Sequence, residues 1–223
     1  MRLSAVTMSK AVKILIVDDH FVVREGLKTI LADRFEEVSC GDAATGPEAL
    51  EKAWAEPWDI VLLDINIPGR GGLDVLKELK QTLPKLPVII LSMHPEEQFA
   101  VRSLKQGAAS YIRKDSAGSE LVRSVEAVLS GSKYITSSVA ETLATHVEKD
   151  RPGAPHESLS DREYQVMCLL ASGKTVKEVG SDLSLSVKTI STYRSRILEK
   201  MRMRNNSELM RYVVRHKLIE TDI

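Results

Sequence analysis

Two hydrophobic periods alternate along the first 130 residues, and this alternation restricts the fold more than any other feature of the chain. Short apolar runs rich in β-branched residues occupy 13–17, 59–63 and 87–91, and such runs suit strands buried on both faces of a sheet. Weaker strand patterns occupy 37–43 and 109–113. Because amphipathic helical patterns separate these runs, the segment is predicted to form a five-stranded parallel α/β sheet. Ligands of such a sheet gather at the carboxyl ends of its strands.

The composition excludes several classes of protein. The chain has 223 residues, which is long enough for two modest domains. No apolar stretch approaches the ~20 residues that span a bilayer, and neither a GxGxxG motif nor a P-loop indicates a nucleotide. The only two cysteines, Cys40 and Cys168, lack metal-ligand spacing, and we interpret them as buried or nearly buried thiols. We therefore expect a cytoplasmic protein that makes no membrane contact.

The net charge of zero hides an asymmetry between the two parts of the chain. Residues 159–223 carry 12 Lys and Arg against 8 Asp and Glu, whereas residues 1–158 carry 19 against 23. Much of the basic charge falls within 186–204, where Glu199 is the single acid. A basic segment beside an acidic partner favours a polyanion as the ligand of the C-terminal part.

Local composition divides the chain into four parts. Residues 1–10 are predicted to form a loose tail, and the α/β pattern fills 11–131. A linker region over 132–158 combines one predicted helix with the stretch 148–158, which is polar, contains Pro and Gly, and has no periodicity. From 159 to 223 the patterns are helical and show no strand signal. Two domains joined by a helix and a flexible tether are therefore expected.

Three carboxylates stand at the ends of predicted strands. Asp18 and Asp19 end the first strand and Asp64 ends the third, so adjacent parallel strands would bring them to one edge. Like charges at short range repel and raise one another's pKa. Mg²⁺ takes oxygen ligands and keeps several waters, so two carboxylates and a backbone carbonyl would suffice to hold it. A hydroxyl, Ser92, and an ammonium, Lys114, lie at two further strand ends and suit additional anionic oxygens.

The segment after residue 158 has the pattern of a helix-turn-helix. Ser160 followed by Glu163 is a capping pattern ahead of an apolar helix face. A short second helix precedes the turn at 183–186, and a third helix is predicted over 187–201 with a buried stripe formed by Ile190, Ile197 and Met201. The other face of that helix is basic and rich in hydroxyls, as in a DNA-recognition helix. A fourth, amphipathic helix is predicted over 207–219.

Residues 12–130 resemble the receiver domain of two-component response regulators, through the motifs VDDH, LLDINIPGRGG, IILS and YIRKD. The resemblance implies a doubly wound, flavodoxin/CheY-like domain in which a histidine kinase phosphorylates Asp64. It also implies a Mg²⁺ ion bound by Asp19, Asp64 and the backbone carbonyl of Asn66, with Asp18 acting through water. Charge neutralisation of this kind is what phosphoryl transfer requires.

The same resemblance implies roles around the phosphoryl group. Lys114 would pair with the phosphoryl oxygens, Ser92 would hydrogen-bond them, and Tyr111 would change rotamer together with Ser92. A proline often follows this lysine in the family, whereas Asp115 follows it here. His94 is interpreted as a surface loop histidine, with control of water access to the phosphoryl group as the alternative. The loop after the acceptor would be shaped by Pro68, Gly69 and Gly72.

Residues 159 to about 219 resemble the four-helix DNA-binding domain of LuxR/NarL (FixJ) regulators. By this resemblance the base-edge candidates are Ser191, Thr192 and Ser195, and the candidates for contact with the DNA backbone are Lys188, Thr189, Tyr193, Arg194 and Arg196. Two residues depart from the pattern. Tyr193 stands where His is usual, although its hydroxyl can still bond a phosphate. Gly180 stands where Ala is usual, and it should weaken its helix by up to ~1 kcal/mol or permit closer packing.

We therefore interpret the chain as a DNA-binding response regulator of the NarL/FixJ class and not as an enzyme. Its expected partners are a sensor histidine kinase, double-stranded DNA, RNA polymerase and, after phosphorylation, a second copy of itself. Two other classes stay open. A Mg²⁺-dependent hydrolase with Asp64 as nucleophile would need a second carboxylate where Asn66 stands. A phosphorylation-independent, protein-binding adaptor is disfavoured by the complete set of acids.

Overall fold

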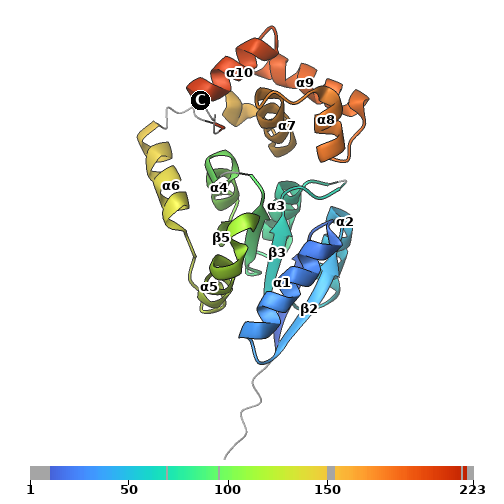
Figure 1. Ribbon diagram of the computed structural model, residues 1–223, viewed down its shortest axis with the longest axis vertical. Helices are drawn as coiled ribbons and strands as arrows, with labels where there is room; N and C mark the ends of the chain where they lie inside the picture. Colours follow the sequence, from blue (N-terminus) through green and yellow to red (C-terminus); the bar gives the residue numbers. More distant parts are fainter. Residues whose placement is uncertain (1–10, 69, 95, 150–153, 217, 220–223) are drawn as a thin grey trace, which may run out of the picture.

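The structure is a computed structural model that describes residues 11–68, 70–94, 96–149, 154–216 and 218–219, so the expected N-terminal tail and Gly69 lie outside the described residues. Strands and helices alternate through the first part of the chain (Figure 1). These elements are β1 (Val12–Val17), α1 (Phe21–Arg34), β2 (Val38–Ala43), α2 (Gly46–Ala55), β3 (Ile60–Asp64), α3 (Gly72–Thr82), β4 (Val88–Ser92), α4 (Glu96–Lys105), β5 (Ser110–Arg113), the 3₁₀ helix η1 (Lys114–Ser116) and α5 (Ala117–Leu129).

The five strands form one parallel sheet in the order β2-β1-β3-β4-β5. Every residue of β3 and β4 is buried, because helices cover both faces of these apolar runs. One apolar cluster joins the sheet to α1 and α5, and another joins it to α2, α3 and α4. The predicted doubly wound five-stranded sheet is confirmed. Since β1 and β3 are neighbours, the acids that end them meet at one edge.

The segment after α5 is more regular than its composition indicated. Helix α6 (Ser137–Lys149) lies alongside α4 (Figure 1) and buries Val139. A 3₁₀ helix, η2 (Pro155–Ser158), follows, with a proline in its first turn where no backbone N–H is required. The stretch 148–158 was predicted to be irregular, but residues 148–149 belong to α6 and residues 155–158 form η2. Residues 150–153 lie outside the described part of the chain.

Four α-helices follow in the described part of the C-terminal segment, as predicted: α7 (Asp161–Ala171), α8 (Val176–Asp182), α9 (Val187–Lys200) and α10 (Asn206–Arg215). The expected capping box of Ser160 and Glu163 is present at the start of α7. The predicted stripe on α9 is buried at Ile190, Ile197 and Met201. The last helix ends at Arg215, four residues before the predicted end at 219, because the chain turns at His216.

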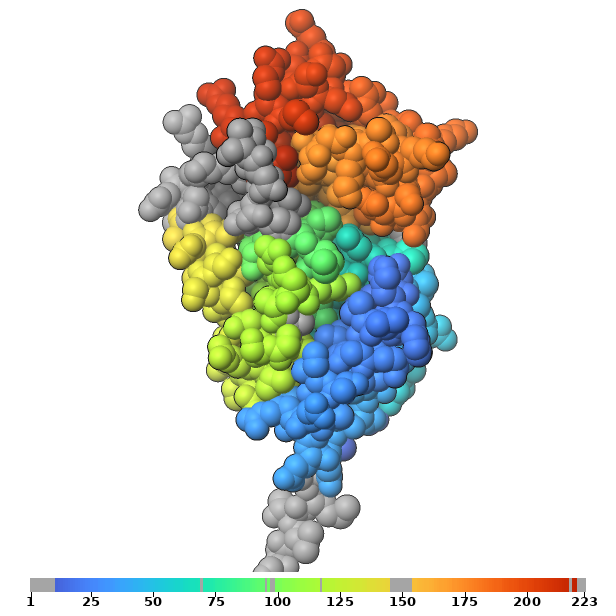
Figure 2. Space-filling view, viewed as in Figure 1, coloured from blue at the N-terminus to red at the C-terminus, as the bar shows by residue number. Residues whose placement is uncertain are grey.

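The C-terminal helices are seated directly on the first domain (Figure 2). Phe99 of α4 and Tyr164 of α7 form an edge-to-face aromatic pair with 5.6 Å between ring centroids. The Arg102 guanidinium donates hydrogen bonds to the Asp161 carboxylate and to the carbonyl of Leu159. It also lies 4.8 Å from the centre of the Tyr164 ring. One apolar cluster therefore runs from the sheet into the C-terminal helices.

Candidate functional site: an acid edge beneath a DNA-binding domain

Three charged groups converge at the carboxyl edge of the sheet. Lys114, which follows β5, places its Nζ 2.5 Å from Asp18 Oδ2 and 2.8 Å from Asp64 Oδ2. Both acids are almost inaccessible, with 1% of Asp18 and 2% of Asp64 exposed. The edge predicted from the ends of β1, β3 and β5 is therefore assembled as expected. A buried acid pair is tolerated here because one ammonium bridges it.

The ionisation of this edge reflects its burial. Burial raises the pKa of Asp64, and although Lys114 opposes this effect, the nearby carboxylate of Asp18 adds to it. Burial lowers the pKa of Lys114, but Asp64 and Asp18 outweigh burial, so that the net pKa is raised and the ammonium stays charged. A further cation at this edge would favour the anionic form of Asp64.

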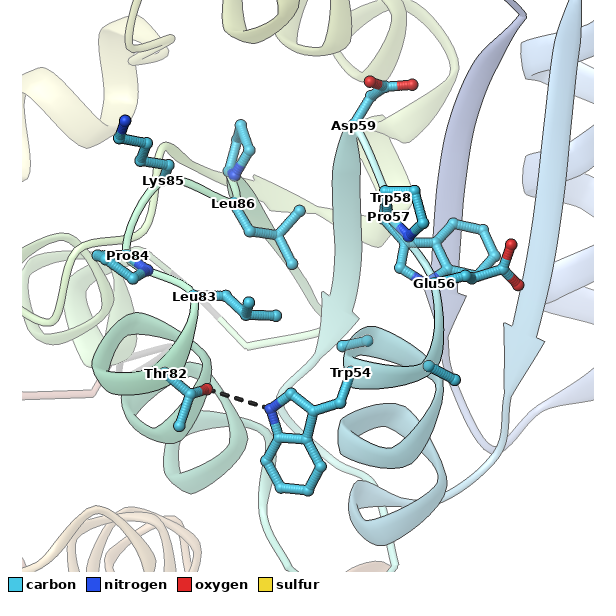
Figure 3. A pocket seen from close by; sticks show the side chains of 13 residues that line it. Trp54, Glu56, Pro57, Trp58, Asp59, Thr82, Leu83, Pro84, Lys85 and Leu86 are labelled. Carbon is cyan, nitrogen blue, oxygen red and sulfur yellow. Dashed lines mark hydrogen bonds between the residues drawn. The ribbon is translucent and has the colours of Figure 1, made fainter.

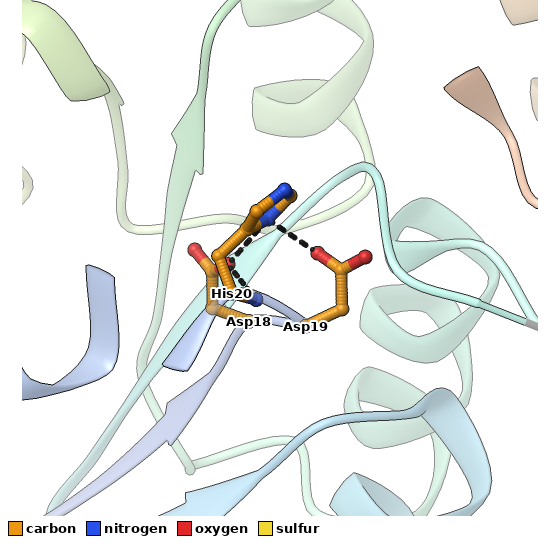
Figure 4. Close-up of side chains that lie close together, drawn as sticks. All are labelled: Asp18, Asp19 and His20. Atoms are coloured by element: carbon orange, nitrogen blue, oxygen red, sulfur yellow. Dashed lines mark hydrogen bonds and ion pairs between the residues drawn. The ribbon is translucent and has the colours of Figure 1, made fainter. Parts of the chain in front are cut away.

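Asp19 lies beside this bridge and contacts His20 (Figure 4). His20 Nδ1 is 2.7 Å from Asp19 Oδ1 and 3.3 Å from Asp18 Oδ1. One potential ligand atom from each of these three residues lies within 4.8 Å of the others. Asp18 Oδ2 and Asp19 Oδ1 are buried oxygens whose contacts are the ion pairs with Lys114 and His20. Asp18 and Asp19 thus lie close enough together to supply oxygen ligands to one hard cation.

The expected phosphoryl and switch residues are joined through His94. Ser92 is fully buried, and its Oγ accepts a hydrogen bond from the His94 backbone N–H at 3.0 Å. The Tyr111 hydroxyl donates to the His94 carbonyl at 2.9 Å. Burial raises the pKa of Tyr111, so this hydroxyl keeps its proton. The structure therefore brings Ser92, His94 and Tyr111 into one set of contacts, in which the Tyr111 hydroxyl also interacts with the Ser92 side chain. The expected joint movement of Ser92 and Tyr111 stays a prediction.

His94, expected to be a surface loop histidine, lies in the loop after β4 and is half-buried. Its Nε2 lies 3.1 Å from Asn66 Nδ2 and 3.3 Å from Asn66 Oδ1, so the tautomer of the ring sets which residue donates. The ring packs against Phe99 with 4.9 Å between centroids. Burial lowers its pKa to about 4, so the imidazole is neutral near pH 7 and can accept from the Asn66 amide. The amide oxygen of Asn66 accepts a hydrogen bond from Gln165 Nε2 of α7. The sequence did not single out Gln165.

The loop after Asp64 requires the glycine predicted to shape it. A Cβ atom on Gly72 would overlap the backbone oxygen of Asp64, and the Gly72 N–H bonds the carbonyl of Ile65 at 3.0 Å. Pro68 is partly buried in the same loop. The loop therefore folds tightly back on β3, as its Pro and Gly content indicated.

The expected DNA-contact residues lie on α9, and they differ in their exposure to solvent and in their contacts within the domain. Lys188, Ser191, Thr192, Ser195 and Arg196 are exposed. The hydroxyls of Ser191, Thr192 and Ser195 donate to helix carbonyls four residues earlier, which leaves their oxygen lone pairs available.

Three other expected DNA-contact residues are engaged within the domain. Thr189 Oγ1 lies 2.8 Å from the hydroxyl of the cap residue Ser186, and Arg194 Nε donates to Asn206 Oδ1 at 2.7 Å. Tyr193 is partly buried and packs against the core. Arg196 therefore has greater freedom than Arg194 to reach a phosphate.

A hollow of about 800 Å³ lies at the opposite end of the sheet (Figure 3). It is bounded by the segments that precede β3 and β4, and the Trp54 indole donates to Thr82 Oγ1 at 3.2 Å. Parallel sheets bind ligands at their carboxyl ends, so the acid edge, and not this hollow, is the candidate site. Among the described residues no helix has the length and apolar character needed to cross a membrane.

Two family comparisons agree with this geometry. Residues 14–126 match the family "Response regulator receiver domain", and residues 157–213 match "Bacterial regulatory proteins, luxR family". The chain is 34% identical over 212 residues to Response regulator UvrY of Escherichia coli O6:H1, covering 95% of this chain and 97% of that relative. It is also 34% identical over 210 residues to Response regulator GacA of Pseudomonas aeruginosa, covering 94% and 98%.

Solved structures agree on the fold. A LuxR-family two-component response regulator from Aurantimonas shares 30% identity and a TM-score of 0.58, over 63% of this chain and all of that chain. A structure of the RcsB–DNA complex, at 24% identity, covers 92% of this chain and 98% of that chain with a TM-score of 0.58.

The sheet with its acid edge and the attached helix-turn-helix define a two-domain signalling protein that binds DNA. The chain belongs to the response regulator family, in the NarL/FixJ class with a LuxR-type DNA-binding domain. It is therefore a DNA-binding transcription regulator of a two-component system.

Proposed function

We propose that Asp64 is the phosphoacceptor and that a sensor histidine kinase supplies the phosphoryl group. The observation that carries this proposal is the Lys114 bridge, whose Nζ lies 2.8 Å from Asp64 Oδ2 at the edge where β1, β3 and β5 end. An ammonium fixed on the acceptor oxygen is placed to neutralise an incoming phosphoryl group. Ser92 supplies a buried hydroxyl at the same edge, within β4.

Mg²⁺ would be held by Asp19, Asp64 and the Asn66 carbonyl, with Asp18 acting through water. The proximity of the Asp18 and Asp19 carboxylates, whose potential ligand atoms lie within 4.8 Å of each other, supports this assignment. When bound, the ion would neutralise charge that develops on the transferred group. The chain's own residues would do the remaining work, since Lys114 pairs with the oxygens and Asp64 attacks.

We propose that the reaction ends when the phosphoryl group has been transferred to Asp64. Asn66 stands two residues after the acceptor, where a hydrolase would need a second carboxylate, and its side chain is occupied by His94 and Gln165. An amide cannot act as a general base near neutral pH. We therefore propose no enzymatic turnover.

The proposed domains are the receiver over 11–131, a linker region over 132–158 and the DNA-binding domain over 159–223, in a protein acting in the cytoplasm. The receiver's proposed output is dimerisation on phosphorylation, which would place two copies of α9 on a pair of half-sites and present the dimer to RNA polymerase. The exposed hydroxyls and basic side chains of α9 support this role.

Acetyl phosphate with Mg²⁺ tests the acceptor assignment by intact-protein mass spectrometry. The wild-type chain should gain one phosphate, and Asp64→Asn should gain none. A phosphate retained by Asp64→Asn would overturn the assignment of Asp64, and repeated release of inorganic phosphate from esters would favour the hydrolase.

A further inference from the structure

Two residues other than glycine have a left-handed backbone conformation in the described part of the chain, and both border the helix α9. Ser184 has a φ of 52° in the turn before α9, and Arg202 has a φ of 54° just after it. A residue with a side chain adopts this conformation at a steric cost, because its Cβ lies too close to the following carbonyl oxygen. A residue that is held there despite the cost suggests a use for its side chain.

The chain leaves α9 through a Schellman motif, with arginine at the position that favours glycine. The Met203 N–H bonds the carbonyl of Leu198 at 2.8 Å, and the Arg202 N–H bonds the carbonyl of Glu199 at 3.0 Å. The side chains of Met203 and Leu198 pack against the apolar core. Hydrogen bonds and packing therefore hold residue 202 in the left-handed conformation.

Three other helices end in the same motif and have glycine at this position. Gly107, Gly131 and Gly173 follow α4, α5 and α7, with φ values of 98°, 85° and 88°. The N–H groups of each glycine and of the residue after it bond carbonyls in the last turns of the helix, as at Arg202. The chain thus uses glycine for this turn elsewhere, and the arginine after α9 is an exception.

The Arg202 side chain is available to a ligand. It is exposed, and within the described residues it makes no hydrogen bond or ion pair. Two other cations of α9 are engaged: Lys200 Nζ donates to Glu163 Oε2 at 2.7 Å, and Arg194 Nε donates to Asn206. The end of α9 therefore leaves the Arg202 guanidinium for an anion from outside the domain.

The length of α9 places this end beyond the bases of a bound duplex. A helix of 14 residues is about 21 Å long, whereas the major groove of B-DNA is about 12 Å wide. When the N-terminal part of a recognition helix contacts base edges, its other end therefore extends towards the sugar–phosphate backbone. This end carries the negative pole of the helix dipole, which repels phosphate. A cation at position 202 offsets that repulsion.

We propose that Arg202 binds a phosphate of the DNA backbone at the C-terminal end of α9, and that the left-handed backbone of this residue is retained for that contact. The site would accept a phosphodiester in any sequence, because phosphates carry no base information. Arg202 would thus be a binding residue in addition to those expected from the sequence. The inference rests on α9 as the recognition helix of the proposed function, and it is independent of the phosphorylation of Asp64.

The test measures binding of the full chain to a fluorescein-labelled duplex of mixed sequence, by anisotropy over a salt series. Arg202→Gly should reduce the slope of log K against log salt by about 0.9 per bound chain, which corresponds to about fivefold weaker binding at about 0.15 M salt. The same variant should slow hydrogen exchange of the last amides of α9, because glycine adopts the left-handed conformation without the steric cost. Weaker binding together with a better protected helix end separates a binding role from a structural one.

Matched variants separate charge from backbone strain. Arg202→Gln keeps a side chain on the left-handed backbone and removes the charge, so it should weaken binding as much as Arg202→Gly without slowing exchange. Arg202→Lys should keep the wild-type slope. Ser184→Gly removes the same backbone strain without removing a charge, so its slope should also be that of wild type. Arg123→Gln removes an exposed charge from α5 of the receiver and should leave the slope unchanged.

Wild-type slopes in both Arg202→Gly and Arg202→Gln would overturn the proposal, as would an equal loss of slope in Arg123→Gln. Faster exchange at the end of α9 in Arg202→Gln, with a wild-type slope, would show that the cation serves only the negative pole of the helix, and this result also overturns the proposal. If Arg196→Ala leaves the slope unchanged as well, α9 is not the recognition helix and the proposed function fails instead, so the two failures are distinguished.

Discussion

Gly72 has the most demanding steric environment around the acceptor, because its Cα faces the backbone oxygen of Asp64 with no room for a side chain. Gly72→Ala should therefore destabilise the receiver by about 1–3 kcal/mol, the usual cost of overpacking. Urea denaturation followed by tryptophan fluorescence reports on this domain, since Trp54 and Trp58 both lie in it. Gly26 is the matched control: it lies within α1 with open space around it, so Gly26→Ala should stabilise by about 0.5–1 kcal/mol. Equal effects at both glycines would contradict the packing argument.

The free energy of unfolding of the DNA-binding domain should depend on the ionisation of Glu163 at acid pH. Burial raises the pKa of Glu163, but the Lys200 ammonium at 2.7 Å and the hydrogen bonds from Ser160 outweigh burial and bring the net pKa below its ordinary 4.5. The ionised form is thus favoured by folding. Its contribution is present above the unfolded pKa and is lost as pH falls through the lowered folded pKa.

Glu163→Gln tests this sign. The variant should lose about 1–2 kcal/mol of unfolding free energy at pH 7, through the weakened capping box and ion pair. The difference from wild type should shrink as the pH is lowered from 5 towards 3, when measured by urea denaturation with circular dichroism. A difference that grows over that range would show that the pKa is raised and not lowered.

At the residue level, the sequence located the acid edge but missed the contact between Asn66 and Gln165, for a physical reason. Asp64 and Ser92 end β3 and β4, and Asp18 and Lys114 follow β1 and β5. Parallel pairing alone brings such strand ends together. Gln165 and Asn66 are 99 residues apart and meet only because two domains dock. No local period or motif encodes that contact.

Among the elements, α8 shows how packing overrides helix propensity. A Cβ atom on Gly180 would lie 2.8 Å from the carbonyl oxygen of Leu185 in the turn before α9. Of the two interpretations of Gly180 made from the sequence, a weaker helix or closer packing, the structure supports closer packing. Gly180→Ala should therefore destabilise the helix-turn-helix despite a propensity gain of about 1 kcal/mol. Faster hydrogen exchange of the α8 amides would confirm it, whereas slower exchange would show that propensity decides.

The extent to which helix α7 is buried could not be predicted from its amphipathic pattern alone. Every residue from Arg162 to Ala171 is buried, although the sequence shows one apolar face formed by Val166, Leu169 and Leu170. The second face is covered by the receiver. Gln165 donates to Asn66 of that domain, whereas Arg162 donates to Gln165 and to the Leu183 carbonyl within its own domain. Similarly, the end of α6 and the helix η2 replace parts of the stretch predicted to be irregular, because α6 packs on α4.

For the whole molecule, DNA affinity should depend strongly on salt. Each phosphate contact contributes a slope of about −0.9 in log K against log salt. Arg196→Ala should weaken all sequences together and reduce the slope by about one contact, because Arg196 is exposed on α9. Arg194→Ala should also disturb the bond to Asn206 and so lower stability. Thr192→Ala should instead relax sequence preference. Fluorescence anisotropy over a salt series distinguishes these outcomes, and a salt-insensitive affinity would contradict the basic-helix argument.

The central claim is that the charge state of one carboxylate controls DNA binding by the other domain. The most direct measurement compares the affinity of the full chain for a paired half-site and for a single half-site, before and after treatment with acetyl phosphate and Mg²⁺. Two linked copies gain avidity without new base contacts. Phosphorylation should increase the mass in light scattering from monomer to dimer and tighten binding to the paired site much more than to the single site, with no change in Asp64→Asn. Unchanged mass and unchanged paired-site affinity in phosphorylated wild-type protein would contradict it.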